Sequence, residues 1–256
     1  MRIPAIGVMA LILFSSSVEA AGQTPEERAA LRDVAAKRGD AVVRVLATRK
    51  VRQTINGREQ SRDQAVQTHA TTLDGTGLVV TALSEFEAPD AVTDALRASA
   101  PAGITISMST EVVDLRMRLA DGREVPAKTV LRDADLDLMF IRPADALPAP
   151  VPIVDAPSGK PSVLDPLVVI QRTGEMSGSK AMPVLSYVQV LVDKPRAFFI
   201  ASAVGLAAGG AGMPVFDVSG RFVGVIVRIA GTRANPLPGI LPADDLREIA
   251  KQAMGK

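Results

Sequence analysis

The side chains that could carry out nucleophilic or acid–base chemistry are few in this 256-residue sequence. It contains no cysteine and a single histidine, His69. Thiol catalysis, disulfide bonds and thiolate metal sites are therefore excluded, as is any site that needs two histidines from one chain. Hydroxyl chemistry remains, in which a serine attacks, a base accepts its proton and a carboxylate orients that base. We expect no metal and no cofactor in such a site.

One glycine-rich segment, 174–180, has some similarity to a phosphate-binding loop. Only three residues separate its two glycines, where the phosphate-binding motif has four, and a serine precedes its lysine. No long helix follows whose N-terminus could face a phosphate. We therefore interpret this segment as a hairpin loop. The formal net charge of +1 also excludes the basic surface that is typical of nucleic-acid-binding proteins.

Most elements that could position these residues are predicted to be β-strands, because branched apolar runs alternate with Gly, Pro, Asn and Asp. Asn56-Gly57, between charged flanks, predicts an exposed hairpin tip. Helices are expected at 25–37, 88–98 and 243–254, the first and last opening with a proline. The expected strands are 41–48, 67–73, 78–82, 111–119, 125–131, 136–141, 167–171, 182–192, 197–203, 213–217 and 222–229.

The first twenty residues predict an export signal rather than part of the fold. Arg2 precedes an apolar run over residues 3–14, which is too short to span a bilayer comfortably. Val18 and Ala20 then complete a signal-cleavage pattern, and no cysteine follows for lipid attachment. We expect a mature chain that starts near Ala21, is periplasmic or secreted, and has no transmembrane helix.

Residues 143–166 differ from their flanks because they contain seven prolines. That composition is typical of a connector, and it divides the chain into two halves rich in strands. Two packed barrels or a sandwich would satisfy this pattern. The expected divisions are 1–20 for the signal peptide, 21–40 for a helical lead-in, 41–142 for the first β-barrel, 143–166 for the connector, and 167–256 for the second β-barrel with a C-terminal helix.

Several motifs follow one another in a recognisable order. They are Ala41-Val-Val-Arg-Val after a helix, Gly77-Leu-Val-Val-Thr81-Ala-Leu-Ser84, Leu119-Ala-Asp-Gly-Arg-Glu124, Asp137-Leu-Met-Phe-Ile141, and Gly209-Gly-Ala-Gly-Met-Pro-Val with Gly220-Arg-Phe-Val-Gly224. In this order they resemble trypsin-like serine proteases, specifically the bacterial HtrA-type (DegP-like) peptidase domain, over about residues 30–253. The resemblance implies an all-β fold of two six-stranded β-barrels with short flanking N- and C-terminal helices.

The resemblance also implies three catalytic positions, and this sequence departs from two of them. Ser84 stands where the family has its histidine, and a serine hydroxyl is not basic near neutral pH. Ala211 stands where the family has its nucleophile, and a methyl group cannot attack a carbonyl. Only Asp137 matches the residue type of the family. Because loss of the nucleophile leaves no covalent path, the resemblance implies a pseudoprotease. Met213 replaces a later glycine of the motif and is expected to crowd the former cleft.

The first function that stays open is a binding or scaffold module for a peptide or protein ligand in the cell envelope. The backbone N–H groups of Gly209, Gly210 and Ala211 could still bind a carbonyl or carboxylate, as an oxyanion hole does, because that device needs no side chain. The HtrA-type PDZ domain is expected to be absent, since the chain ends at Lys256. The oligomeric state is open.

The second function is a serine endopeptidase-type hydrolase with a non-standard active site. His69 is its only possible base, and a pairing of Asp74 with Gly77 across the turn would bring Ser84 diagonally near His69. A nucleophile, a base and oxyanion donors must all converge in such an enzyme, so the single histidine favours the binding module. The candidate nucleophiles are Ser84, Ser186, Ser202 and Ser219.

Overall fold

The computed structural model describes residues 24–87, 90–101, 103–174, 178–194, 196–202, 211–229 and 237–255. The expected export signal, residues 1–20, lies outside the described residues. So do Gly209 and Gly210.

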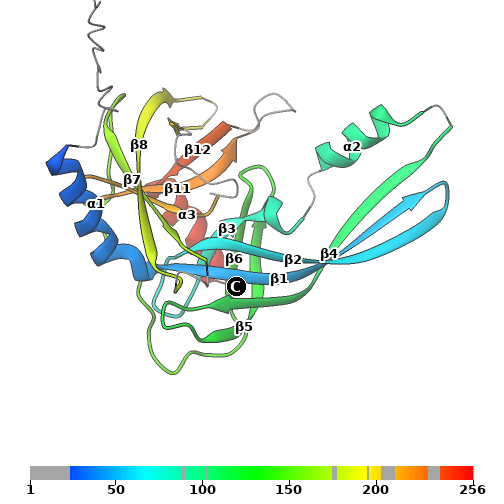
Figure 1. The fold of residues 1–256 in the computed structure, drawn as a ribbon, viewed down its shortest axis with the longest axis horizontal. Coiled ribbons are helices and arrows are strands. Elements are labelled where there is room, and N and C mark those ends of the chain that lie inside the picture. The colour runs from blue at the N-terminus through cyan, green and yellow to red at the C-terminus, as the bar shows by residue number, and fades with distance from the viewer. Residues whose placement is uncertain are drawn as a thin grey trace, which may run out of the picture.

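The chain folds into two closed β-barrels, each with six antiparallel strands (Figure 1). The first barrel has the strand order β1-β2-β3-β6-β5-β4, and the second has the order β10-β11-β12-β9-β8-β7. The predicted all-β fold of two six-stranded barrels is therefore confirmed. The strands are β1 Val42–Ile55, β2 Arg58–Thr72, β3 Val79–Ala82, β4 Ile106–Arg118, β5 Glu124–Asp133, β6 Leu138–Pro143, β7 Pro166–Arg172, β8 Ala181–Val192, β9 Phe198–Ala201, β10 Pro214–Asp217, β11 Phe222–Ile229 and β12 Leu237–Pro242.

Short helices flank the barrels. Helix α1, Pro25–Arg38, begins with a capping box in which Thr24 and Glu27 satisfy each other's backbone N–H groups. Helix α3, Ala243–Met254, follows β12 directly and buries Leu246 against the barrels. Helix α2, Asp90–Ser99, lies between β3 and β4. Two 3₁₀ turns complete the elements, η1 at Gly39–Ala41 and η2 at Leu83–Glu85.

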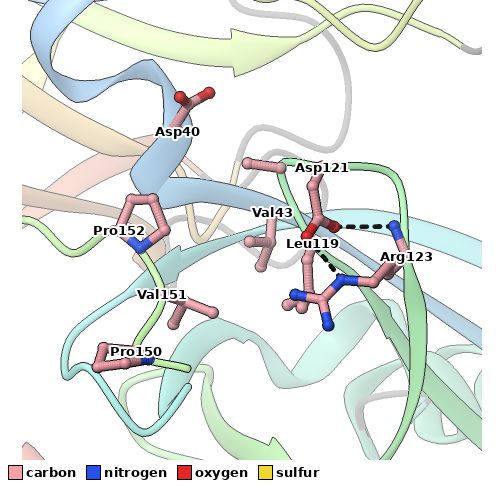
Figure 2. A pocket seen from close by; sticks show the side chains of 9 residues that line it. Asp40, Val43, Leu119, Asp121, Arg123, Pro150, Val151 and Pro152 are labelled. Carbon is pink, nitrogen blue, oxygen red and sulfur yellow. Dashed lines mark hydrogen bonds and ion pairs between the residues drawn. The ribbon is translucent and has the colours of Figure 1, made fainter. Parts of the chain in front are cut away.

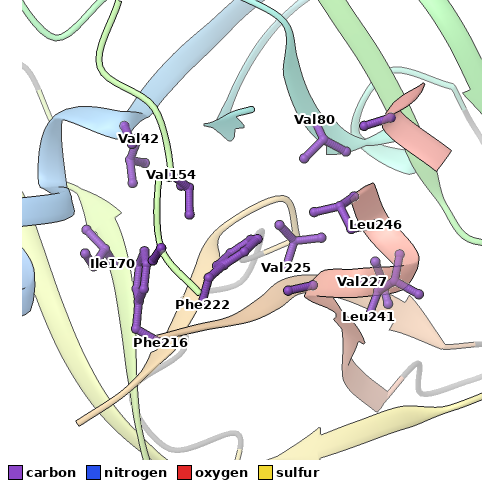
Figure 3. Packing of buried hydrophobic residues seen from close by; sticks show 14 of the residues in the cluster. Val42, Val80, Val154, Ile170, Phe216, Phe222, Val225, Val227, Leu241 and Leu246 are labelled. Atoms are coloured by element: carbon purple, nitrogen blue, oxygen red, sulfur yellow. The ribbon is translucent and has the colours of Figure 1, made fainter. Parts of the chain in front are cut away.

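One hydrophobic cluster joins the two barrels into a single packed unit. Val80 of β3 and Phe222 of β11 both belong to it, together with Leu246 of α3 (Figure 3). Val154 contributes from residues 144–165, which connect the barrels and form no helix or strand apart from an isolated bridge at Ser158. Each barrel also has a smaller cluster of its own. The face between the barrels is thus firmly packed, which fixes the side chains placed along it.

The first hairpin is much longer than its sequence pattern predicted. β1 and β2 pair without interruption from Val42 opposite Thr71 to Ile55 opposite Arg58, and together with β4 they project from the barrel as a three-stranded arm (Figure 1). The predicted tip is confirmed, because Asn56 and Gly57 both have positive φ, as a two-residue hairpin turn requires. The prediction stopped at residue 48 because polar residues beyond it showed no buried face.

One further difference from the expected elements has a local cause, and one expected loop is confirmed. Strand β12 was not predicted, because two of its six residues are prolines, which normally argue against a strand. The segment 174–180 joins β7 to β8, whose Arg172 and Ala181 are paired, so its interpretation as a hairpin loop is confirmed for the ends that the structure describes.

Candidate functional site

Ser84 and Asp137 come together because the strands next to them are paired. Ser84 lies in η2, just after β3, and Asp137 immediately precedes β6. Ala82 of β3 is opposite Leu138 of β6, so the ends of the two strands lie side by side. Asp137 accepts a hydrogen bond from the Ser84 backbone N–H at 2.6 Å on Oδ1 and from the Ser84 hydroxyl at 2.8 Å on Oδ2. Both oxygens of its carboxylate therefore accept a hydrogen bond from the same residue.

A third member of this site comes from the other barrel. Arg228, on β11, donates from Nη1 to the Ser84 Oγ at 2.8 Å and forms an ion pair through Nη2 with Glu85. Asp137, Ser84, Glu85 and Arg228 thus form a continuous polar chain between the barrels, called here the inter-barrel network. Sequence reasoning missed Arg228 and Glu85, because neither belongs to a motif and a strand pattern does not show which residues meet across two barrels.

Burial shapes the electrostatics of this network. Removal from water raises the pKa of Asp137, while hydrogen bonds from Ser84 and the positive charge of Arg228 oppose that rise. The Ser84 hydroxyl donates a hydrogen bond to the Asp137 carboxylate and accepts one from the Arg228 guanidinium. A guanidinium is always protonated and cannot act as a base. The acceptor of the Ser84 hydroxyl in this network is therefore a carboxylate, and among the described residues no imidazole takes part in its hydrogen bonds.

His69 lies near enough to this network to interact electrostatically with Glu85, but its ring contacts a different residue. It lies on β2 opposite Arg44, and its Nε2 is 3.0 Å from the carbonyl oxygen of Arg172 in the second barrel. Burial lowers the pKa of His69, and the charges of Arg44 and Arg172 lower it further, against the carbonyl contact, which raises it. The ring is thus a contact between the barrels, and its burial disfavours the charged form. Ser84 takes its hydrogen bonds from other partners, so the conceivable Ser84–His69 pair is not formed.

The segment around Ala211 packs tightly between the barrels. Ala211 is only 2% exposed, and its methyl group makes no polar contact. Gly212, at φ +85°, donates its N–H to Ile226 at 2.7 Å, while its carbonyl accepts the Thr71 hydroxyl at 2.7 Å. A Cβ on Gly212 would lie 2.8 Å from the Cα of Thr81. Only glycine fits there, because both the positive φ and the close approach exclude a side chain.

Met213 does not line a cleft, contrary to the sequence-based expectation. It is completely buried and packs inside the second barrel with Val215 and Ile240. Met213 directly precedes strand β10, and its side chain points into the interior of the second barrel. The former cleft is therefore not crowded by this methionine.

The other serines considered as nucleophiles have structural contacts. Ser186 is 1% exposed and donates to the carbonyl oxygen of Ser202 at 3.0 Å. Ser219 donates its hydroxyl to Asp217 at 2.6 Å inside a tight turn. The His69 ring contacts the Arg172 carbonyl rather than any of these hydroxyls. None of these contacts favours the hydrolase hypothesis.

The structure also contains a cavity that is separate from the inter-barrel network. It has a volume of about 260 Å³ and shares no lining residue with the network. Val43, Leu119 and Val151 form its apolar wall, and the ion-paired Asp121 and Arg123 lie at its edge (Figure 2). Among the described residues, no group of three or more His, Asp or Glu side chains could hold a metal ion. No helix in the described part of the chain is long and apolar enough to cross a membrane.

Comparison with known proteins agrees with this architecture. A family model of the trypsin-like peptidase domain matches residues 67–225. Among solved structures, the HtrA-type protease AlgW with a tripeptide is similar at a TM-score of 0.58 and 14% identity, over 86% of this chain and 62% of that one. A variant of AlgW with a decapeptide gives a TM-score of 0.60 and 14% identity, over 88% of this chain and 67% of that one. No curated protein sequence matches this chain.

These similarities carry different weights. At 14% identity the likeness to AlgW shows the fold, and this chain spans about 62% of the length of the tripeptide-bound protease. The family model covers more than half of the chain, and its range includes Ser84, Asp137 and Gly212. The chain belongs to the family of trypsin-like peptidase domains.

Proposed function

We propose that this protein is a proteolytically inactive trypsin-like domain that binds a peptide or protein ligand in the cell envelope. Ser84 occupies the position of the catalytic histidine, Ala211 that of the nucleophile, and Asp137 that of the acid. The observation that carries the proposal is the contact of Arg228 with Ser84. In a working triad the group bound to Asp137 accepts the nucleophile's proton. Here that group is a hydroxyl held by a guanidinium.

The ligand class follows from what the site retains. The HtrA-type protease AlgW has been solved with a tripeptide, and its variant with a decapeptide. Two packed barrels with a polar chain between them suit an extended polypeptide better than a small molecule, because main-chain amides offer regularly spaced donors and acceptors. The oxyanion-type loop of Gly209, Gly210 and Ala211 belongs to this proposal. So do export by residues 1–20, a periplasmic or secreted location, and the division into barrels at 41–142 and 167–256 with a connector between them.

The test of inactivity is labelling with a fluorophosphonate probe, together with digestion of casein. We expect neither, while a trypsin-like protease with an intact triad, measured in parallel, gives both. Stoichiometric labelling that survives Ser84→Ala would show that another serine is activated and would overturn the proposal. Labelling that is lost in both Ser84→Ala and His69→Ala would instead establish a Ser84–His69 dyad and overturn it as well.

A further inference from the structure

The arm formed by β1, β2 and β4 leaves one strand edge open. Its two-residue turn makes Ile55 and Arg58 a hydrogen-bonded pair, so even-numbered residues of β2 point their backbone groups at β1 and odd-numbered residues point away. The odd-numbered Leu73 and Thr71 face β3, as this rule requires. β3 pairs with β2 only from Thr71 onward. The outward N–H and C=O groups of odd residues 59–67 therefore have no partner among the described residues.

The opposite edge of the arm, on β4, is partly covered by a helix. On β4, the carbonyl oxygen of Ile106 accepts a hydrogen bond from Arg97 Nε of helix α2 at 3.0 Å. Helix α2 thus covers the start of that edge (Figure 1). Covering an edge with a helix is one way in which proteins prevent unwanted strand pairing. Among the described residues no helix covers the edge of β2, which makes it the place where a further strand can add.

The charges along β2 oppose pairing with a second copy. Two identical antiparallel strands must align residues of equal parity, because only odd residues offer outward backbone groups. In each such alignment one residue lies opposite its own copy. If that residue is any of residues 58 to 63, like charges face each other: Arg58 faces Arg62, Glu59 faces Asp63, or one of these four residues faces its own copy. An alignment centred further along would drive the partner's Asn56-Gly57 turn into β3. The edge is therefore fitted to a strand of different sequence.

The charges on β2 also indicate which charges an added strand should carry. Arg58 and Arg62 lie on one face of the arm, and Glu59 and Asp63 lie on the other. In the described part of the chain none of these four exposed side chains forms an ion pair, although Asp63 lies opposite Lys50 of β1. Nearby Arg52 and Glu111, by contrast, are paired at 2.9 Å. An antiparallel partner would match all four with the pattern basic-acidic-x-x-basic-acidic.

The open edge leads to the inter-barrel network. Arg49 of β1 donates from Nε to the Gln64 side chain at 3.0 Å and from Nη1 to the carbonyl oxygen of Glu85 at 3.3 Å. Gln64 of β2 is thereby tied to the turn that contains Ser84 and Glu85. A strand added along residues 59–67 would end beside that turn, so one extended chain could contact both the arm and the network.

We infer that the open edge of β2 binds an extended peptide of alternating charge by strand addition and directs it to the Ser84–Arg228 contact. This inference rests on the proposed peptide-binding function and names the class of peptide and where it first binds. The backbone of residues 59–67 supplies the hydrogen bonds, and the charges at residues 58, 59, 62 and 63 select the sequence.

The test uses fluorescence anisotropy with a labelled synthetic peptide that contains Lys-Glu-Thr-Val-Lys-Glu. Its control is the isomer Lys-Glu-Thr-Val-Glu-Lys, which opposes like charges at two of the four positions in either strand direction. We expect the first peptide to bind about tenfold more tightly. Ser61→Pro should abolish binding, because it removes an outward N–H that β1 does not use, whereas Ser61→Ala retains that N–H and should bind normally. Glu59→Lys with Asp63→Lys should weaken binding about tenfold while every outward backbone N–H and C=O group stays in place, although the new lysine at position 63 lies opposite Lys50 of β1.

Three results would overturn the inference. Binding that survives both Ser61→Pro and the double lysine variant would place the peptide elsewhere and leave the proposed function intact. Equal affinity, or no affinity, for the two peptides would refute the charge pattern, while the fluorophosphonate experiment judges the proposed function separately. A dimer in sedimentation that Ser61→Pro dissociates would assign the edge to a second copy of the chain.

Discussion

Replacing Arg228 by methionine tests whether the inter-barrel network holds the barrels together. Methionine keeps most of the length and apolar surface of the arginine stem but removes the guanidinium. The variant loses the hydrogen bond to Ser84 Oγ and the ion pair with Glu85. Asp137 also loses a nearby positive charge that lowers its pKa, so its carboxylate becomes less favourable in the folded state.

The magnitude follows from how exposed these groups are. A buried hydrogen bond to a charged group contributes about 1.5–3 kcal/mol. The side chains of Arg228 and Glu85 are 37% and 21% exposed, so solvent screening reduces each of the two interactions to about 1 kcal/mol. Arg228→Met should therefore lower the free energy of unfolding by about 2 kcal/mol. For a urea m-value of about 3 kcal/mol/M, the midpoint falls by about 0.7 M.

The assay is urea unfolding followed by circular dichroism, with a matched control in the same protein. Arg52 also forms an ion pair with a glutamate, but its side chain and that of Glu111 are 43% and 53% exposed. Arg52→Met should cost no more than about 0.5 kcal/mol. Equal losses in the two variants would refute the reasoning, because they would show that the Arg228 contacts behave as ordinary surface contacts.

Three further predictions concern the inter-barrel face. The pKa of His69 is lowered in the folded state, so the contribution of neutral His69 to stability is complete above the unfolded pKa of about 6.5 and is lost as the pH falls below that value. The free energy of unfolding, measured from pH 7.5 to 5, should therefore fall more steeply in the wild type than in His69→Gln. Parallel curves for the two proteins would contradict this. Gly212→Ala should destabilise by about 3 kcal/mol, because its Cβ would meet the Thr81 backbone at 2.8 Å, whereas Gly122→Ala, with a similar φ of +87° and open space, should cost about 1 kcal/mol in the same urea assay. The double variant Ser84→His with Ala211→Ser should fold, as measured by circular dichroism, and should react slowly with a fluorophosphonate probe. The reaction should become faster when Arg228→Ala removes the guanidinium beside the new imidazole, and should almost disappear with Asp137→Asn. An unfolded double variant would mean that the buried Ala211 site cannot hold a hydroxyl.

The sequence by itself determined the architecture and the limits of the chemistry. Branched apolar runs between turn residues predicted two β-rich halves, and local chemistry located the Asn56-Gly57 tip, since positive φ at both positions depends on those two residue types. The count of one histidine and no cysteine needed no structure to exclude whole classes of active site. The pairing of Asp74 with Gly77 across the turn was one of two registers that the sequence left open, and the structure has it, because the Gly77 N–H donates to the Asp74 carbonyl at 3.1 Å.

Only the tertiary structure decided which residues meet between the barrels. Arg228 and Ser84 are 144 residues apart, and nothing near either one specifies the other. Met213 was expected in the cleft but lies inside a barrel, because the direction of its side chain depends on where β10 begins. The length of the arm was missed for a similar reason: the sequence of residues 49–55 has no repeating apolar pattern, and these residues form a strand because β2 and β4 pair with them on both sides. Local patterns encode the faces of single strands, whereas contacts between barrels depend on how two closed sheets pack.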